Sequence, residues 1–174
     1  MRIIAGAQRG HRIEAPKGLA TRPTSDRARE SAFNLIGPLD GAIVLDLFAG
    51  SGAMGLEALS RGAASCVFVE SSRDACRTIN ANLDKLQLRG TVLQQDAIRA
   101  LAAERRTYDL VLCDPPYDFG ERDRARLATQ LPRVIAPNGL LVYETAAKTE
   151  PAIETLTVRT SRTYGSARLT LFEP

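Results

Sequence analysis

The residues best suited to chemistry are Asp114-Pro115-Pro116-Tyr117, which follow the strand-like run 109–113. Two consecutive prolines fix φ and remove two backbone donors, so this loop is rigid and presents carbonyl oxygens without adjacent N–H groups. The Asp114 carboxylate and the Pro115 carbonyl could accept both protons of a nucleobase NH₂ group and turn its nitrogen toward a methyl donor. Tyr117 could stack on a base taken out of its own stack, worth roughly 1–3 kcal/mol. The alternative is a proline-rich turn with a surface tyrosine.

A second candidate is the glycine-rich segment 46–55, DLFAGSGAMG, which contains the pattern GxGxxG. Gly50 and Gly52 allow a tight turn and a close approach of the backbone to a ligand. Asp46 precedes the glycines, where a carboxylate would repel a pyrophosphate and attract the amino group of a methionine moiety. The segment therefore favours S-adenosylmethionine over NAD or FAD. A tight strand-to-helix turn without a ligand is the alternative.

Two further acids end later strand-like runs. Glu70 lies 24 positions after Asp46, and an acid at about this distance from a glycine loop can accept hydrogen bonds from both ribose hydroxyls. Asp96 could accept from the adenine amino group, or it could cap the next helix. One residue could do both.

The segments that must position these residues alternate between strand-like and helical patterns from Ala42 onward. This alternation predicts βαβ units and a parallel sheet covered by helices on both faces. The last two strand-like runs are separated by Gly165-Ser166, which predicts an antiparallel hairpin. We therefore predict an α/β fold with a Rossmann-like, seven-stranded, mostly parallel sheet. The expected strands are 43–48, 65–70, 91–95, 108–114, 139–145, 156–164 and 167–173, and the expected helices are 53–61, 72–87, 96–105 and 121–135.

The N-terminal segment has a different pattern. Two short extended runs, RIIAG and HRIEAP, predict a small β-hairpin, and Thr24 or Ser25 can cap a helix that runs to about Ile36. We expect a basic hairpin arm over residues 1–20 and a catalytic domain over 21–174.

Positive charge is concentrated at the same end of the chain. Residues 1–36 hold seven Lys and Arg against three acids, a balance of +4, while the rest of the chain balances at −1. Such an arm can meet RNA phosphates without base specificity, although charge alone leaves a merely solvated surface equally open. The candidate RNA contacts are Arg2, Arg9, Arg12 and Lys17.

The composition disfavours several other classes of protein. Hydrophobic residues make up 44% and charged residues 25%, and no apolar run approaches the roughly 20 residues that span a bilayer. The N-terminus has no apolar stretch of the signal-peptide kind, so we expect a cytoplasmic protein. Cys66, Cys76 and Cys113 lack CxxC spacing, so no metal site is expected. The single histidine, His11, lies outside the predicted core, which disfavours Ser-His-Asp or Cys-His catalysis.

In their order along the chain, DLFAGSG, Glu70, the Asp96 turn and DPPY resemble the amino-methylating branch of the Rossmann-like methyltransferases. The likeness extends over essentially the whole chain, because it includes the segment RPTSDRARESAFNLI (22–36), the basic hairpin before it and the terminal YGSARLTLFE. With these segments, the chain resembles the RsmD family. That family methylates N2 of one guanine, position 966 in the usual numbering, of 16S ribosomal RNA.

The resemblance implies S-adenosylmethionine as cofactor, S-adenosylhomocysteine as product and no metal. It implies 16S ribosomal RNA as partner, within an assembled or partly assembled small subunit. It also implies that residues 22–29 lie across the methionine end of the cofactor. The implied catalytic residues are Asp114, Pro115 and Tyr117, and the implied cofactor contacts are Arg22, Thr24, Asp46, Phe48, Gly50, Gly52, Glu70, Asp96 and Ala97.

Two alternatives to this function remain. DPPY also serves adenine-N6 methylation of RNA or DNA, although no stretch of this chain is free to be the target-recognition segment that a DNA enzyme needs. The other alternative is a non-catalytic ribosome-assembly factor that binds RNA and holds the cofactor only for structure. We expect a monomer that does not associate with membranes.

Overall fold

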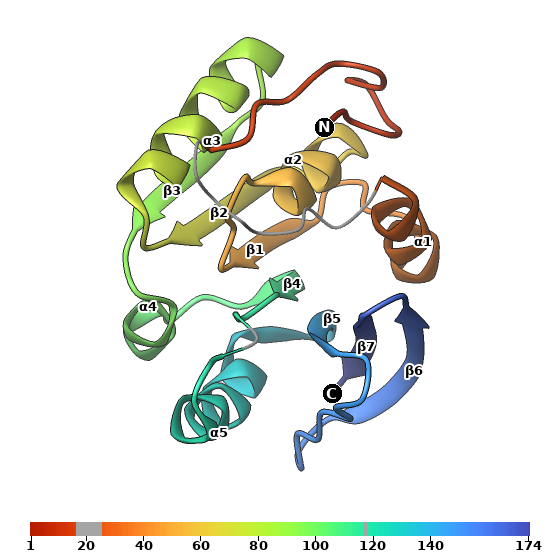
Figure 1. Ribbon diagram of the computed structural model, residues 1–174, viewed down its shortest axis with the longest axis vertical. Coiled ribbons are helices and arrows are strands. Elements are labelled where there is room, and N and C mark those ends of the chain that lie inside the picture. The colour runs from red at the N-terminus through yellow and green to blue at the C-terminus, as the bar shows by residue number, and fades with distance from the viewer. Residues whose placement is uncertain (17–25, 117) are drawn as a thin grey trace.

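The structure is a computed structural model that describes residues 1–16, 26–116 and 118–174. Seven strands form one sheet in the order β3-β2-β1-β4-β5-β7-β6 (Figure 1). The first five strands in this order are parallel to one another, and β7 is antiparallel to both β5 and β6. This confirms the predicted fold class. The strands are β1 (Ile43–Leu47), β2 (Ser65–Glu70), β3 (Gly90–Gln94), β4 (Tyr108–Cys113), β5 (Ile135–Ala146), β6 (Thr157–Tyr164) and β7 (Ala167–Glu173).

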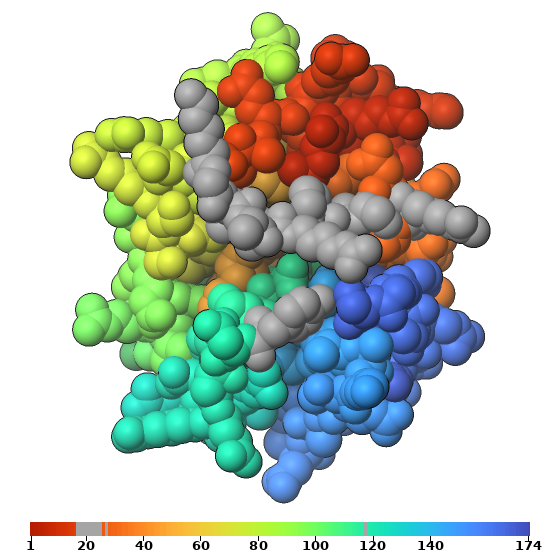
Figure 2. Space-filling view, in the orientation of Figure 1, coloured from red at the N-terminus to blue at the C-terminus, as the bar shows by residue number. Residues whose placement is uncertain are grey.

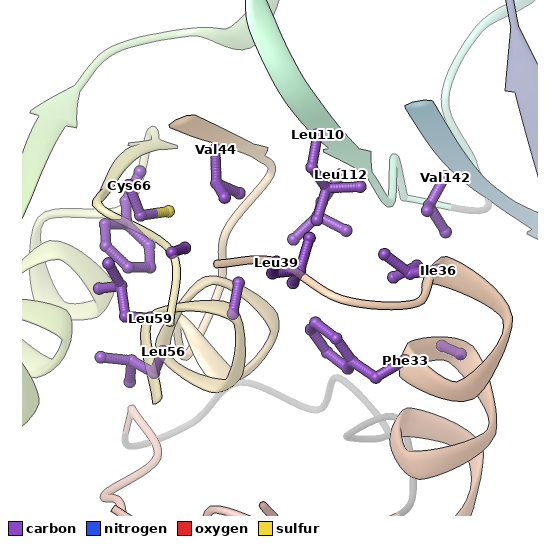
Figure 3. Packing of buried hydrophobic residues seen from close by; sticks show 14 of the residues in the cluster. Phe33, Ile36, Leu39, Val44, Leu56, Leu59, Cys66, Leu110, Leu112 and Val142 are labelled. Carbon is purple, nitrogen blue, oxygen red and sulfur yellow. The ribbon is translucent and has the colours of Figure 1, made fainter. Parts of the chain in front are cut away.

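Helices cover both faces of the sheet. Strand residues alternate between the two faces, so Val44 packs with one group of helices and Leu45 with the other. Figure 3 shows α1 side chains meeting β1, β4 and β5 residues on the first face. The helices on that face are α1 (Asp26–Ile36), α2 (Ala53–Ser60) and α3 (Arg73–Leu86), and those on the other face are α4 (Ala97–Ala103) and α5 (Glu121–Gln130).

Two boundaries, the end of α5 and the start of β5, differ from the expectation by more than two residues. The helix expected to reach residue 135 ends at Gln130 and continues as a 3-10 turn, Leu131–Val134. Pro132 lacks an N–H group, so it fits the start of such a turn better than a helix interior. Strand β5 then begins at Ile135, and its register with β4 shifts between Tyr108 and Leu110.

The N-terminal arm, which we define as residues 1–16, folds back on itself with less pairing than a hairpin. Its antiparallel pairing is one isolated bridge between Arg2 and Arg12. Ile3 and Ile13 are buried against the α1–α3 layer and hold the arm there. Because residues 17–25 lie outside the described ranges, the division at residue 20 stays a prediction.

None of the helices in the described part of the chain is long and apolar enough to cross a membrane.

Candidate active site

The glycine-rich loop leaves the carboxyl end of β1 and leads into α2. Phe48, Gly50 and Gly52 all have positive φ, at 60°, 53° and 75°. The left-handed backbone conformation is strained at Phe48, because a bulky side chain disfavours positive φ. Its ring packs edge-on against Phe119, with centroids 5.3 Å apart. A Cβ added at Gly50 would meet only the Phe48 carbonyl oxygen, at 3.9 Å, so the backbone here is open to a ligand.

Gly52 and Gly55 serve packing instead. A Cβ on Gly52 would lie 3.0 Å from the Ile79 side chain, and one on Gly55 would lie 2.3 Å from Phe68. These glycines let α2 sit close to α3 and the sheet. A larger residue at Gly52 would therefore disturb the fold as well as any cofactor contact.

Asp46 is the buried acid of the loop, with 4% of its surface exposed. Its Oδ2 accepts a hydrogen bond from the Gly55 backbone N–H at 2.9 Å. Desolvation raises the pKa of Asp46 to about 7; the charges of Asp114 and Glu70 add to this, and the Gly55 hydrogen bond opposes it. A cation bound beside Asp46 would favour its ionised form.

Glu70 joins the glycine loop to the end of β2. Its Oε2 accepts from Gly50 N at 2.8 Å, and its Oε1 accepts from Ser72 N at 2.7 Å. The Ser71 hydroxyl also donates to Oε1, at 3.4 Å, whereas Oε2 can still accept a further hydrogen bond. Asp96 is exposed and caps α4 by accepting from Arg99 N at 3.0 Å, which confirms the capping interpretation. Ala97, the first residue of α4, is buried.

Asp114 follows β4 at the same edge, next to the buried Pro115. Although part of its surface is open to solvent, the surrounding protein desolvates the carboxyl group and raises its pKa to about 6. Asp46 and Asp114 share the face of the sheet that α1 and α2 cover, because they alternate in step with Val44 and Leu112.

A third acid, Glu144 on β5, was missed by the sequence reasoning. Cys113 pairs with Tyr143 in the parallel register, so Asp114 and Glu144 follow at matching positions of neighbouring strands. Desolvation, and secondarily the charge of Asp114, raises the pKa of Glu144 to about 8. The available signal was an acid directly after the apolar run GLLVY, the same pattern that identified Glu70.

The structure thus brings the predicted residues from four strand ends to one edge of the sheet. Three predicted site residues, Arg22, Thr24 and Tyr117, lie outside the described residues, as does the predicted RNA contact Lys17. Arg2, Arg9 and Arg12 are exposed on the N-terminal arm. The arm, α5 and the β6–β7 pair all reach the face of the molecule seen in Figure 2.

The hydrogen-bond acceptors at this edge suit a cationic ligand that carries hydroxyl and amino groups. Asp46, Glu70 and Asp114 supply acceptors of negative charge, which would repel a phosphate. The open backbone at Gly50 allows close approach, and the Pro115 carbonyl adds a neutral acceptor. The residues therefore fit S-adenosylmethionine, which carries a sulfonium, an amino group and a ribose.

Comparison with known proteins gives consistent matches over the whole chain. The family model described as conserved hypothetical protein 95 matches residues 1–173. "Putative rRNA methyltransferase YlbH" of Bacillus subtilis (strain 168) is 38% identical over 183 residues, covering 99% of this chain and 98% of that protein. "Ribosomal RNA small subunit methyltransferase D" of Escherichia coli (strain K12) is 36% identical over 156 residues, covering 88% and 76%.

Solved structures are similar as well. "Putative methyltransferase yhhF from Escherichia coli" superposes with a TM-score of 0.86 at 32% identity, covering 99% of this chain and 96% of that chain. SMU.776, described as a "putative methyltransferase complexed with SAH", gives a TM-score of 0.71 at 18% identity, covering 85% and 48%. The second likeness is one of fold alone.

Proposed function

The chain belongs to the RsmD family, whose model is described as conserved hypothetical protein 95, and we propose that it methylates a guanine of small-subunit ribosomal RNA at the N2 amino group, with S-adenosylmethionine as donor. The rRNA methyltransferase names of relatives that match 88% to 99% of the chain support the reaction class. The observation that carries the proposal is the Asp114-Pro115 acceptor pair, which directly follows β4, the neighbour of the strand that leads into the glycine loop.

The cofactor, when bound, supplies a methyl group already activated by the positive sulfur. Asp46 would attract the amino group of its methionine part, Glu70 would accept from the ribose hydroxyls, and Asp96 and Ala97 would lie beside the adenine. Phe48, Arg22 and Thr24 are proposed as further contacts. Asp46 and Glu70 are each held by backbone N–H groups, so both are oriented before any ligand arrives.

The chemistry at the acceptor requires position more than a strong base. The Asp114 carboxylate and the Pro115 carbonyl accept hydrogen bonds from the two amine protons and aim the nitrogen lone pair at the methyl group. That lone pair forms the new N–C bond, and the electrons of the broken C–S bond stay on sulfur. Positive charge grows on nitrogen, which the carboxylate stabilises, and one amine proton then leaves to the Asp114 carboxylate.

Substrate recognition rests on RNA shape and charge in this proposal. A base inside a helix must be turned out to reach the edge of the sheet, and Tyr117 is proposed to stack on it. The exposed arginines of the N-terminal arm would meet phosphates. One small domain offers little surface for reading sequence, so we propose that a monomer acts on an assembled or partly assembled small subunit.

Digestion of RNA to nucleosides after reaction with methyl-labelled cofactor tests the proposal. Unmethylated small subunits and the naked rRNA extracted from them are the two substrates. We expect label in N2-methylguanosine, and more of it from subunits. Label in N6-methyladenosine would identify the adenine alternative, and RNA binding without any label would identify the assembly-factor alternative; either result refutes the proposal.

A further inference from the structure

Glu144 ends up on the side of Asp114 toward which a target base would extend. The sheet order places β1, β4 and β5 side by side, with the glycine loop after β1 and Asp114 after β4. The methyl group must approach the amine from the β1 side, because the cofactor loop is there. The base that carries the amine must therefore extend from Asp114 toward β5. Glu144 is the β5 residue at the matching position, one strand away from Asp114.

The Glu144 side chain faces the same layer as Asp114. Leu140 and Val142 of β5 belong to the core under α1 and α2, and strand alternation puts Glu144 on their side. Glu144 also lines a small hollow together with Pro115 and Pro116 of the acceptor loop, with Arg124 of α5 at the same hollow. Glu144 is thus part of the wall that continues from the amine-holding loop.

The Glu144 carboxyl group lacks an internal partner in the described part of the chain. No described residue donates a hydrogen bond to it or forms an ion pair with it. Its charged neighbours are Asp114 on β4, which repels it, and Arg124 on α5, which borders the hollow. A partly buried acid beside a second acid is costly unless a donor arrives from outside.

We propose that Glu144 is a specificity-determining residue that accepts a hydrogen bond from N1–H of the target base and so selects guanine over adenine. This inference rests on the proposed function and names a recognition element for it. In guanine, the amine at C2 is adjacent to N1–H, so two neighbouring carboxylates meet a continuous row of donors. In adenine, the ring nitrogen beside the amine carries a lone pair, which a carboxylate would repel. A site that must leave such a group unpaired rejects the wrong ligand strongly.

Desolvation raises the pKa of Glu144, so its charged form would gain from an N–H donor supplied by a ligand. A donor at N1 would restore the charged form, as N–H donors do for other buried carboxylates.

The test uses RNA in which the methylated guanine is replaced by 2-aminopurine. This analogue keeps the amine at C2 but has a lone pair at N1. Reconstituted small subunits carrying either base are methylated by the wild-type protein, Glu144→Gln and Glu144→Asp. Glu150→Gln is the control, because Glu150 is an exposed acid just beyond β5. The readout is the ratio of kcat/KM for guanine to that for 2-aminopurine.

We expect wild type and the control to prefer guanine by about 10- to 100-fold, the usual discrimination from hydrogen bonds to one base edge. Glu144→Gln should narrow the ratio to about threefold or less, because its amide can also donate to a ring lone pair. Glu144→Asp should keep the preference for guanine at a lower rate. A ratio that does not change in Glu144→Gln, or a wild type without preference, overturns the inference. Absence of methylguanosine with wild type on unmodified RNA instead refutes the proposed function itself.

Discussion

Two regions of this protein desolvate acidic groups and treat them in opposite ways. Under the N-terminal arm, Glu57 is fully buried, and its two oxygens accept the backbone N–H groups of Ile4 and Ala5 at 2.8 and 3.0 Å. Arg61 and Arg29 lie 2.8 and 3.7 Å from the same carboxylate. We call these three charged side chains the arm anchor. Asp26 lies 3.0 Å from Arg29 and supplies the second negative charge, so the charges of the arm anchor are paired inside the protein. The hydrogen bonds to Ile4 and Ala5 join the arm to α2.

At the carboxyl edge the acids Asp46, Asp114 and Glu144 lie on neighbouring strands and share one sign. The pKa of each is raised, chiefly by desolvation. Positive charge is expected to arrive with the cofactor, and neutral N–H donors are expected to arrive with the base. Removing one partner of a buried ion pair should therefore weaken the fold strongly. A desolvated acid that has no opposite charge beside it instead weakens the fold and strengthens binding of a ligand that supplies the partner.

The largest effect should come from the arm anchor. Glu57→Ala removes a carboxylate from the buried Arg29, the partly exposed Arg61 and two N–H groups of the arm, which should cost about 3–5 kcal/mol of unfolding free energy. Urea unfolding at neutral pH measures it. Glu30→Ala, an exposed acid of α1, is the control and should change stability by less than about 0.5 kcal/mol. A Glu57→Ala protein as stable as the control would show that the anchor is not structural.

Asp114→Ala should have the opposite effect, because it should slow methyl transfer strongly and leave the stability of the fold nearly unchanged. Removing one preorganised partner of the reacting amine should slow single-turnover methyl transfer about 10²–10³-fold while RNA binding stays nearly normal. Asp114→Asn should be milder, because an amide oxygen still accepts a hydrogen bond. Asp118→Ala, at an exposed acid four residues further on, is the control. Near-normal rates for Asp114→Ala would remove this loop from the catalytic site.

Asp46→Asn isolates the charge at the cofactor side. The amide oxygen can still accept from Gly55 N–H, so the fold should remain while affinity for S-adenosylmethionine falls about tenfold or more. Calorimetric titration gives the dissociation constant. Glu70→Gln should also weaken binding. If affinity is unchanged in both variants, the carboxyl edge does not hold the cofactor.

The unmatched acids should make stability depend on pH. An acid whose pKa is higher in the folded than in the unfolded chain binds more protons when folded, so it favours folding below its unfolded pKa, and this contribution is lost as pH rises through the folded value. For Asp46, Asp114 and Glu144, with pKa values of about 7, 6 and 8, the loss falls between about pH 4 and pH 8.

Glu144→Gln should therefore raise Tm by about 2–4 °C at alkaline pH, which corresponds to about 1 kcal/mol for a chain of this size, and should leave Tm unchanged at about pH 4, below the unfolded pKa. Thermal melts of wild type, Glu144→Gln and the control Glu150→Gln, recorded across this pH range, measure the difference in Tm. An equal Tm difference at both ends would show that charge at residue 144 does not burden the fold.

The smallest effect concerns the surface of the N-terminal arm. Arg9→Ala with Arg12→Ala should lower the salt slope of RNA binding by about 0.7–0.9 for each phosphate that is no longer neutralised, and should leave cofactor affinity unchanged. Arg77→Ala, an exposed arginine of α3, is the control. RNA binding is measured over a salt series for wild type, the double variant and the control. If the salt slope is the same in all three, the arm is held by its anchor but does not bind RNA.

Local patterns predicted most of the fold and the acids at three of the strand ends. Buried parallel strands read as apolar runs, and Asp46, Glu70 and Asp114 were identifiable because each follows or ends such a run. Helix α5 was predicted too long, because the periodic pattern outlasts the break at Pro132. The two runs of the predicted N-terminal hairpin share one bridge, and the arm is held to the helices by its buried isoleucines and by Glu57.

Hydrophobic period and turn residues act over a few positions, so the amino-acid sequence was enough to identify which residues end each strand. Which of those residues become neighbours depended on the tertiary structure. Asp114 and Glu144 are 30 positions apart and meet because β4 and β5 pair in one register. Glu57 stands in an apolar helix and is satisfied by N–H groups of the N-terminal arm, 52 and 53 positions away. Desolvation and charge act through space, so the character of these acids follows from the fold and not from their place in the chain.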